Sequence, residues 1–102
     1  HAPLLLGAKV ILVDCLSEKP VLDCAQIEEK ITRRTRAIMP VHLNGRAVDM
    51  KAINQLAKKH NLFVVEDTCQ SFLSCNSDGY LGTQSDAGCF SLGVTKLIET
   101  GQ

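Results

Sequence analysis

The chain has no surplus of charge of either sign. Its eleven Lys and Arg side chains balance eleven Asp and Glu side chains, so the formal net charge at pH 7 is zero. A protein that binds nucleic acid or an acidic membrane surface usually carries a surplus of basic residues. The composition therefore predicts neither kind of partner.

Long hydrophobic runs and targeting signals are missing as well. No apolar stretch approaches the roughly 18 residues that a membrane-spanning helix needs. Residues 1–7 begin without Met and carry no basic cluster before their apolar part, so they do not resemble a secretory signal peptide. We therefore expect a cytosolic protein without a membrane partner.

The cysteines provide no disulfide or metal framework. There are five of them, an odd number, and none forms a Cys-x-x-Cys pair. Most lie in apolar or strand-like surroundings, where cysteine usually behaves as a small hydrophobic residue. A reduced protein is favoured, and because the three histidines are scattered, the sequence predicts no zinc site.

What the chain does contain is an alternation of apolar runs and amphipathic segments, within a length that allows one domain at most. The apolar runs predict strands at residues 10–14, 37–41, 62–66 and 88–92. Asp23 and Asp49 are suited to cap helices that end near residues 32 and 60. The turn-rich segment 74–86 predicts a loose hairpin.

Near-continuous apolar strands alternating with helices indicate right-handed crossovers and a mostly parallel sheet. We therefore predict a three-layer α/β/α fold with helices on both faces of the sheet. Ligands of such sheets bind beyond the carboxyl ends of the strands. Asp67 follows a predicted strand at this edge, and Lys96 lies in the loop or first helical turn after the last predicted strand.

An acid at one strand end and a lysine beyond another are what a pyridoxal phosphate (PLP) site requires. The lysine amine can form a Schiff base, and a carboxylate can partner the pyridinium nitrogen. Asp67 and Lys96 are therefore the candidate pair. Taken singly, an acid that ends a strand is more often a cap or loop anchor, as we expect for Asp14, and a lysine after a strand is usually a solvated surface residue.

Several short segments in a fixed order carry the most specific signal. They are residues 35–45, 49–53, 57–62, 65–71, 82–87, 89–91 and 95–96. Their order and spacing resemble the middle of the large domain of the DegT/DnrJ/EryC1/StrS family, the sugar-nucleotide aminotransferases of PLP fold type I. No single segment is diagnostic, but together they span nearly all of the chain.

The resemblance implies roles for four residues. Lys96 would be the Schiff-base lysine and the general acid and base that moves a proton between two cofactor carbons. Asp67 would bind the pyridine nitrogen and keep it protonated. Gln70 would lie near the cofactor ring and its phenolic oxygen, and Ser91 would donate a hydrogen bond to the cofactor phosphate. For Gln70 and Ser91, a simple capping role is the alternative.

Two other polar residues are weaker candidates. His42 could act as a base, but a structural or loop role is at least as consistent with its position. Glu66 precedes Asp67 on a predicted strand, so its side chain should point to the opposite face. We therefore do not expect Glu66 to be a second catalytic carboxylate.

The resemblance also implies substrates and an assembly. These are a keto-sugar nucleotide, glutamate or glutamine as amino donor, and a homodimer that makes amino sugars for lipopolysaccharide, other cell-surface polysaccharides or antibiotics. Related dehydratases carry histidine in place of the lysine, so Lys96 favours transamination. Leu97 stands where the family often has Asn, and Gln102 stands where it often has Glu; these departures bear on substrate choice more than on cofactor chemistry.

The family's enzymes are several times longer than this chain. We therefore expect residues 1–102 to be part of the PLP-binding large domain, without the N-terminal segment and the C-terminal small domain, and inactive alone. A non-catalytic α/β fragment stays open as an alternative. So does another fold type I enzyme, such as a sugar dehydratase or a desulfurase.

Overall fold

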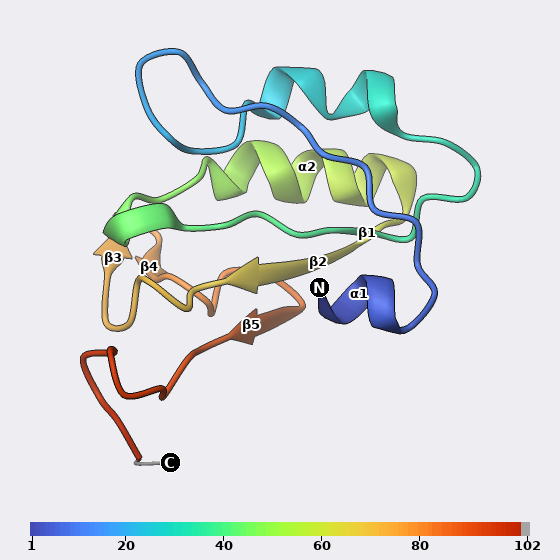
Figure 1. Cartoon of the computed structure of the whole chain (residues 1–102). Helices are drawn as coiled ribbons and strands as arrows, with labels where there is room; N and C mark the ends of the chain where they lie inside the picture. The colour runs from blue at the N-terminus through green and yellow to red at the C-terminus, as the bar shows by residue number, and fades with distance from the viewer. Residues whose placement is uncertain (101–102) are drawn as a thin grey trace.

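The computed structural model describes residues 1–100, and its centre is a three-stranded parallel sheet (Figure 1). The strands are β1 (Ala37–Ile38), β2 (Phe63–Asp67) and β5 (Ala87–Cys89), and β2 lies in the middle. Both neighbours run parallel to β2, so the three carboxyl ends meet at one edge. We call this edge the carboxyl edge.

Helix α2 (Met50–His60) connects β1 to β2 and packs against the sheet (Figure 1). The Asp49 side chain accepts a hydrogen bond from the Ala52 amide at 3.0 Å and caps the helix start. Asn61 ends the helix in the left-handed conformation, with φ of 53°. Ile53 is fully buried in the core beneath the helix, a contribution of about 1.5–3 kcal/mol for a side chain of this size.

Much of the predicted pattern is confirmed. The helix expected to end near residue 60 is α2, and the strand expected at 62–66 is β2, shifted by one residue. The loose hairpin is formed by β3 (Cys75–Asn76) and β4 (Gly79–Tyr80), which pair antiparallel. The strand expected at 88–92 is β5, which is shorter and begins at Ala87.

The strand predicted at 10–14 is wrong. Residues 8–14 have no regular structure, and the Leu12 side chain is 83% exposed. The nearest strand-like pairing is an isolated antiparallel bridge between Cys15 and Leu22. The apolar run suits a strand, but within residues 1–100 no neighbouring strand pairs with it. A strand without a partner leaves its backbone groups to water.

The helix predicted from Asp23 to residue 32 is also wrong. Asp23 does cap a turn, since its side chain accepts a hydrogen bond from the Ala25 amide at 3.0 Å. The segment then forms two short 3-10 helices, η1 (Cys24–Gln26) and η2 (Glu28–Lys30). Ile27 is its one fully buried residue, and so small an apolar face cannot propagate a longer helix.

The strand predicted at 37–41 is interrupted. Its ladder stops at Ile38, and Val41 makes only an isolated parallel bridge to Asp67. Pro40 has no N–H to donate, although its carbonyl accepts a hydrogen bond from the Asp67 amide at 2.9 Å. A single helical turn, α1 (Ala2–Leu5), was not predicted at all.

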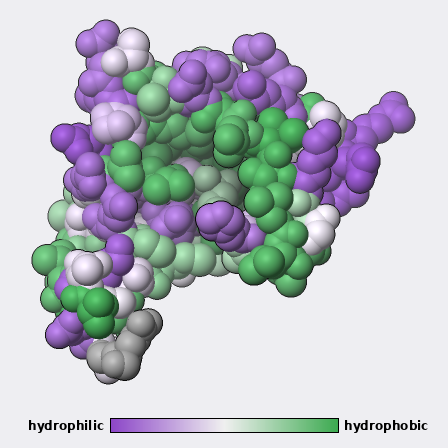
Figure 2. All heavy atoms as spheres, in the orientation of Figure 1, coloured by the Kyte–Doolittle hydropathy of each residue, from purple (hydrophilic) through white to green (hydrophobic). Residues whose placement is uncertain are grey.

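Hydrophobic side chains also reach the surface. In Figure 2 they form broad areas on the face that is shown. The large apolar residues that are most exposed among those described include Leu5, Leu6, Leu12 and Leu97. Among the described residues, no helix is long and apolar enough to cross a membrane.

Candidate active site at the carboxyl edge

Asp67 lies at the centre of the carboxyl edge, held from both sides. Its carbonyl accepts a hydrogen bond from the His42 amide at 3.0 Å, on the β1 side. On the β5 side, the amide of the next residue, Thr68, donates to the Cys89 carbonyl at 2.9 Å. The carboxylate is half-buried, and its Oδ1 accepts from the Cys69 amide at 3.0 Å.

Lys96 lies in the loop that follows β5. A turn positions it, because its amide donates to the Gly93 carbonyl at 2.9 Å. Its side chain is half-buried. Ser91 lies in the same loop, and its Oγ accepts a long hydrogen bond of 3.5 Å from the Gly93 amide. Both residues therefore follow the strand that lies directly beside Asp67.

The Cys69 thiol is affected by both Asp67 and Lys96. Its hydrogen bond with the Asp67 carboxylate, together with burial, raises the pKa of Cys69 to about 11, and the Lys96 ammonium opposes this shift. The Asp67 carboxylate has the largest influence on this thiol, and the Lys96 ammonium has the smallest of the influences that act on it.

Gln70 lies in the turn after β2 and is exposed. Its Oε1 accepts a hydrogen bond from the Asn44 amide at 3.3 Å. Asn44 belongs to η3 (Leu43–Gly45), the turn beyond β1, where it adopts a φ of 52°. Gln70 therefore ties the loop after β2 to the loop after β1, which is the capping role weighed above.

The four residues predicted from the sequence therefore lie on segments that leave the sheet at its carboxyl edge. Asp67 and Gln70 come from β2 and its following turn, and Ser91 and Lys96 come from the loop after β5. No hydrogen bond among residues 1–100 joins these four side chains to one another. The edge presents a carboxylate, an amide, a hydroxyl and an amine.

A buried polar cluster that the sequence did not predict lies behind this edge. Glu66 and His42 are both fully buried and lie 3.0 Å apart, from Oε2 to Nε2. His42 has the structural role that was one of its two alternatives. One signal could have revealed the cluster. Glu66 follows the apolar Val64 by two residues on β2 and so shares its buried face, where a carboxylate needs partners.

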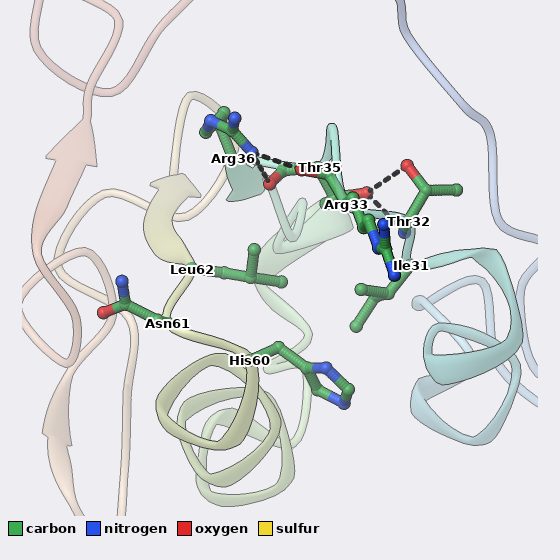
Figure 3. Close-up of a pocket in the computed structure, with 8 residues that line it drawn as sticks. All are labelled: Ile31, Thr32, Arg33, Thr35, Arg36, His60, Asn61 and Leu62. Carbon is green, nitrogen blue, oxygen red and sulfur yellow. Dashed lines mark hydrogen bonds between the residues drawn. The ribbon is translucent and has the colours of Figure 1, made fainter.

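A hollow among the described residues lies away from this site. It has a volume of about 480 Å³ and lies between the end of α2 and the segment before β1. Figure 3 shows its lining, in which Arg36 folds back and donates to the carbonyls of Arg33 and Thr35 at 2.8 and 2.9 Å. These residues adjoin the amino ends of β1 and β2, at the edge opposite Asp67.

Comparison with known proteins settles the family. The sequence model of the DegT/DnrJ/EryC1/StrS aminotransferase family matches residues 1–102. The chain belongs to this family. The DegT/DnrJ/EryC1/StrS family is PLP-dependent. The chain's membership therefore agrees with the kind of site that the pair Asp67 and Lys96 predicts.

Curated relatives of this DegT/DnrJ/EryC1/StrS chain are sugar aminotransferases. It is 45% identical to a GDP-perosamine synthase of Escherichia coli O157:H7, over 94% of this chain and 26% of the relative. It is 43% identical to dTDP-3-amino-3,4,6-trideoxy-alpha-D-glucose transaminase of Micromonospora megalomicea, over 91% of this chain and 25% of that protein. The chain therefore spans about a quarter of the length of these relatives.

Solved structures confirm the predicted fold class. The aminotransferase from Psychrobacter cryohalolentis superposes with a TM-score of 0.91 at 28% identity, over 96% of this chain and 25% of that one. NtdA from Bacillus subtilis, solved with bound cofactor PMP, gives a TM-score of 0.86 at 36% identity, over 96% and 22%. The chain thus has part of the α/β fold of this family's PLP-dependent enzymes.

Proposed function

We propose that this chain forms part of the large, cofactor-binding domain of a PLP-dependent aminotransferase. The complete enzyme would transfer an amino group from glutamate or glutamine to a keto-sugar nucleotide in amino-sugar biosynthesis. The family match supports the reaction class. The names of two relatives, a GDP-perosamine synthase and a dTDP-amino-sugar transaminase, support a nucleotide-linked sugar as substrate. A homodimer, a cytosolic location and a lipopolysaccharide product stay predictions.

One observation carries the proposal. Asp67 ends β2, and the loop that contains Lys96 leaves the neighbouring parallel strand β5 at the same edge. A cofactor that must meet a carboxylate at one end and an amine at another needs this juxtaposition.

The groups at the carboxyl edge fit the chemistry of PLP. When it is bound, this cofactor supplies an electron sink for carbanions at the amino-bearing carbon. Asp67 would accept a hydrogen bond from the ring nitrogen, and its negative charge would keep that nitrogen protonated. Its half-buried position leaves the carboxylate within reach of a ligand at the edge.

Lys96 would hold the cofactor covalently and then move a proton as general base and general acid. The hydrogen bond from the Lys96 amide to the Gly93 carbonyl holds the backbone of Lys96 in place, while its side chain can still swing. Such a tether suits a group that must visit two neighbouring carbons.

Ser91 and Gln70 would contact the two remaining polar parts of the cofactor. Among the described residues, the Ser91 Oγ only accepts a hydrogen bond, so its hydrogen is available to a phosphate oxygen. The Gln70 carbonyl oxygen is occupied by the Asn44 amide, which leaves its NH₂ group to donate to the phenolic oxygen.

A chemical label tests the assignment of Lys96. The complete enzyme should be loaded with PLP, reduced with borohydride and digested, and the modified peptide identified by mass spectrometry. We expect the label on Lys96 and its loss in Lys96→Ala. Lys58→Ala is the matched control, because Lys58 is exposed on α2, and it should keep the label on Lys96. A label on another lysine, or none on the wild type, would refute the proposal.

A further inference from the structure

The buried carboxylate of Glu66 has four hydrogen-bond donors, and no Lys or Arg among residues 1–100 forms an ion pair with it. Oε2 accepts from the His42 ring at 3.0 Å and from the Gly82 amide at 2.7 Å. Oε1 accepts from the Gln84 amide at 2.8 Å and from the Ser85 hydroxyl at 2.9 Å. Each of the two carboxylate oxygens therefore accepts two hydrogen bonds, which is its full capacity.

The histidine donates through one defined nitrogen. The Val48 amide donates to Nδ1 of His42 at 3.1 Å, so Nδ1 must be an unprotonated acceptor. The ring proton then resides on Nε2 and points at Glu66. His42 is neutral in this arrangement, and the Glu66 charge is balanced by four neutral donors rather than by an ion pair.

These donors come from both segments that flank the end of β2. His42 follows β1, and its own amide donates to the Asp67 carbonyl at 3.0 Å. Gly82, Gln84 and Ser85 lie in the loop that leads directly into β5, and β5 leads to Lys96. Glu66 thus joins three chain segments one residue before Asp67, on the opposite face of the strand.

The loop before β5 is packed too tightly to take another position easily. Gly82 has a φ of 87°, and a Cβ there would lie 2.7 Å from the Thr68 hydroxyl oxygen. A Cβ on Gly88 would lie 2.0 Å from the Gly82 carbonyl oxygen. Thr68 in turn donates to the Cys89 carbonyl through both its amide and its hydroxyl, at 2.9 and 2.7 Å. The loop that Glu66 binds therefore has little room to move.

We propose that Glu66 is a positioning residue for the cofactor edge: its carboxylate fixes the loop 81–85, and through it β5, so that Lys96 meets the cofactor held by Asp67. This role rests on the proposed function. Glu66 does not touch the cofactor, because its side chain points away from the face of Asp67. It acts by fixing how β5 lies against β2, so that the residues that follow the two strands can contact the same cofactor.

Glu66→Gln in the complete enzyme tests this role. An amide NH₂ cannot accept, so two of the four donors lose their partner and the loop 81–85 is released. We expect the dissociation constant of PLP, measured by absorbance titration, to rise about 10- to 100-fold, the range known for outer-shell partners of metal ligands. We also expect faster amide hydrogen exchange over residues 81–90 and a fall in kcat larger than the change in KM.

Two controls separate positioning from general stability. Ile53→Val removes a methyl group from the core beneath α2, lowers the melting temperature, and should leave the affinity for PLP and kcat unchanged. Glu29→Gln alters an exposed glutamate in η2 and should change none of these quantities. Affinity for PLP within twofold of wild type in Glu66→Gln, or an equal loss in Ile53→Val, overturns the role.

A second variant covers the case in which Glu66→Gln does not fold. Ser85→Ala removes one donor and keeps the carboxylate, so we expect PLP binding about threefold weaker, the value of one neutral hydrogen bond. Unchanged binding in Ser85→Ala then overturns the role. A wild-type enzyme that takes up no PLP refutes the proposed function, and the role with it.

Discussion

Glu66 and Asp67 are adjacent carboxylates on one strand, yet they lie in opposite surroundings. Glu66 is 0% exposed and accepts four hydrogen bonds, whereas Asp67 is half-buried and its side chain accepts one from the Cys69 amide and one from the Cys69 thiol. The alternation of a β-strand sends the first into the scaffold and the second to the open edge. The comparison teaches that a carboxylate with every lone pair occupied maintains structure, while one with acceptor capacity to spare can bind a ligand.

The same contrast is visible in the electrostatics. Burial by itself would raise the pKa of Glu66, but hydrogen bonds from Gly82, His42, Ser85 and Gln84 outweigh it and lower the pKa. Glu66 is thus held ionised by its neighbours. Asp67 instead raises the pKa of a neighbour, the Cys69 thiol. The neighbours of Glu66 therefore shift its pKa, whereas Asp67 shifts the pKa of the thiol beside it.

The largest expected effect is on catalysis, through Asp67. Asp67→Asn removes the negative charge that would keep the pyridine nitrogen protonated, so we expect kcat of the complete enzyme to fall about 100- to 1,000-fold. The melting temperature should change little, because Asn can still accept the Cys69 amide. Steady-state kinetics and calorimetry measure the two quantities. A kcat within threefold of wild type would contradict the role of Asp67.

The next effect is on stability, through Glu66. Glu66→Ala leaves four buried donors without an acceptor, so we expect the free energy of unfolding to fall by about 3 kcal/mol. Urea denaturation of the complete enzyme measures this loss. Glu29→Ala, at an exposed site, should stay within about 0.5 kcal/mol of wild type. Equal losses at the two sites would show that the buried hydrogen bonds of Glu66 add nothing to stability.

The third effect is a pH dependence that arises from Glu66. Its pKa is lower when folded than when unfolded, so its stabilisation is complete above the unfolded pKa of about 4.3. It is lost as the pH falls through the lower folded pKa. Melting temperatures between pH 7 and 3 should therefore fall less steeply below pH 4.3 in Glu66→Gln than in the wild type. Parallel curves would show that Glu66 does not titrate as described.

The smallest effect is a change in thiol reactivity beside Asp67. A pKa of about 11 leaves Cys69 with about 100-fold less thiolate at neutral pH than a cysteine at the ordinary 9.0. Iodoacetamide should therefore alkylate Cys69 more slowly than the exposed Cys75. Asp67→Asn should speed the reaction at Cys69 and leave Cys75 unchanged, as followed by peptide mass spectrometry. If the substitution leaves the rate at Cys69 unaltered, the carboxylate does not control this thiol.

The parts of the fold that sequence predicts correctly are those specified by neighbouring residues. Asp49 caps α2 through an amide three residues away, and Asn61 ends it by its own backbone conformation. By contrast, residues 10–14 have the composition of a strand, but a strand also needs a partner, and local pattern does not supply one.

The candidate site divides in the same way. Asp67 and Lys96 could be placed at one edge because parallel strands share their carboxyl end, and the family resemblance supplied Gln70 and Ser91. The Glu66 cluster joins positions 16 to 24 residues apart, so no local spacing reveals it. Only its buried register on β2 hints that partners must exist.

The protonation state of the bound cofactor tests the division between the two carboxylates most directly. PLP labelled with ¹⁵N in its ring should be bound to the complete enzyme, and its nitrogen chemical shift measured by NMR. We expect a protonated nitrogen in the wild type and in the loaded fraction of Glu66→Gln, and an unprotonated nitrogen in Asp67→Asn. A protonated nitrogen in Asp67→Asn, or an unprotonated one in the wild type, would contradict this division.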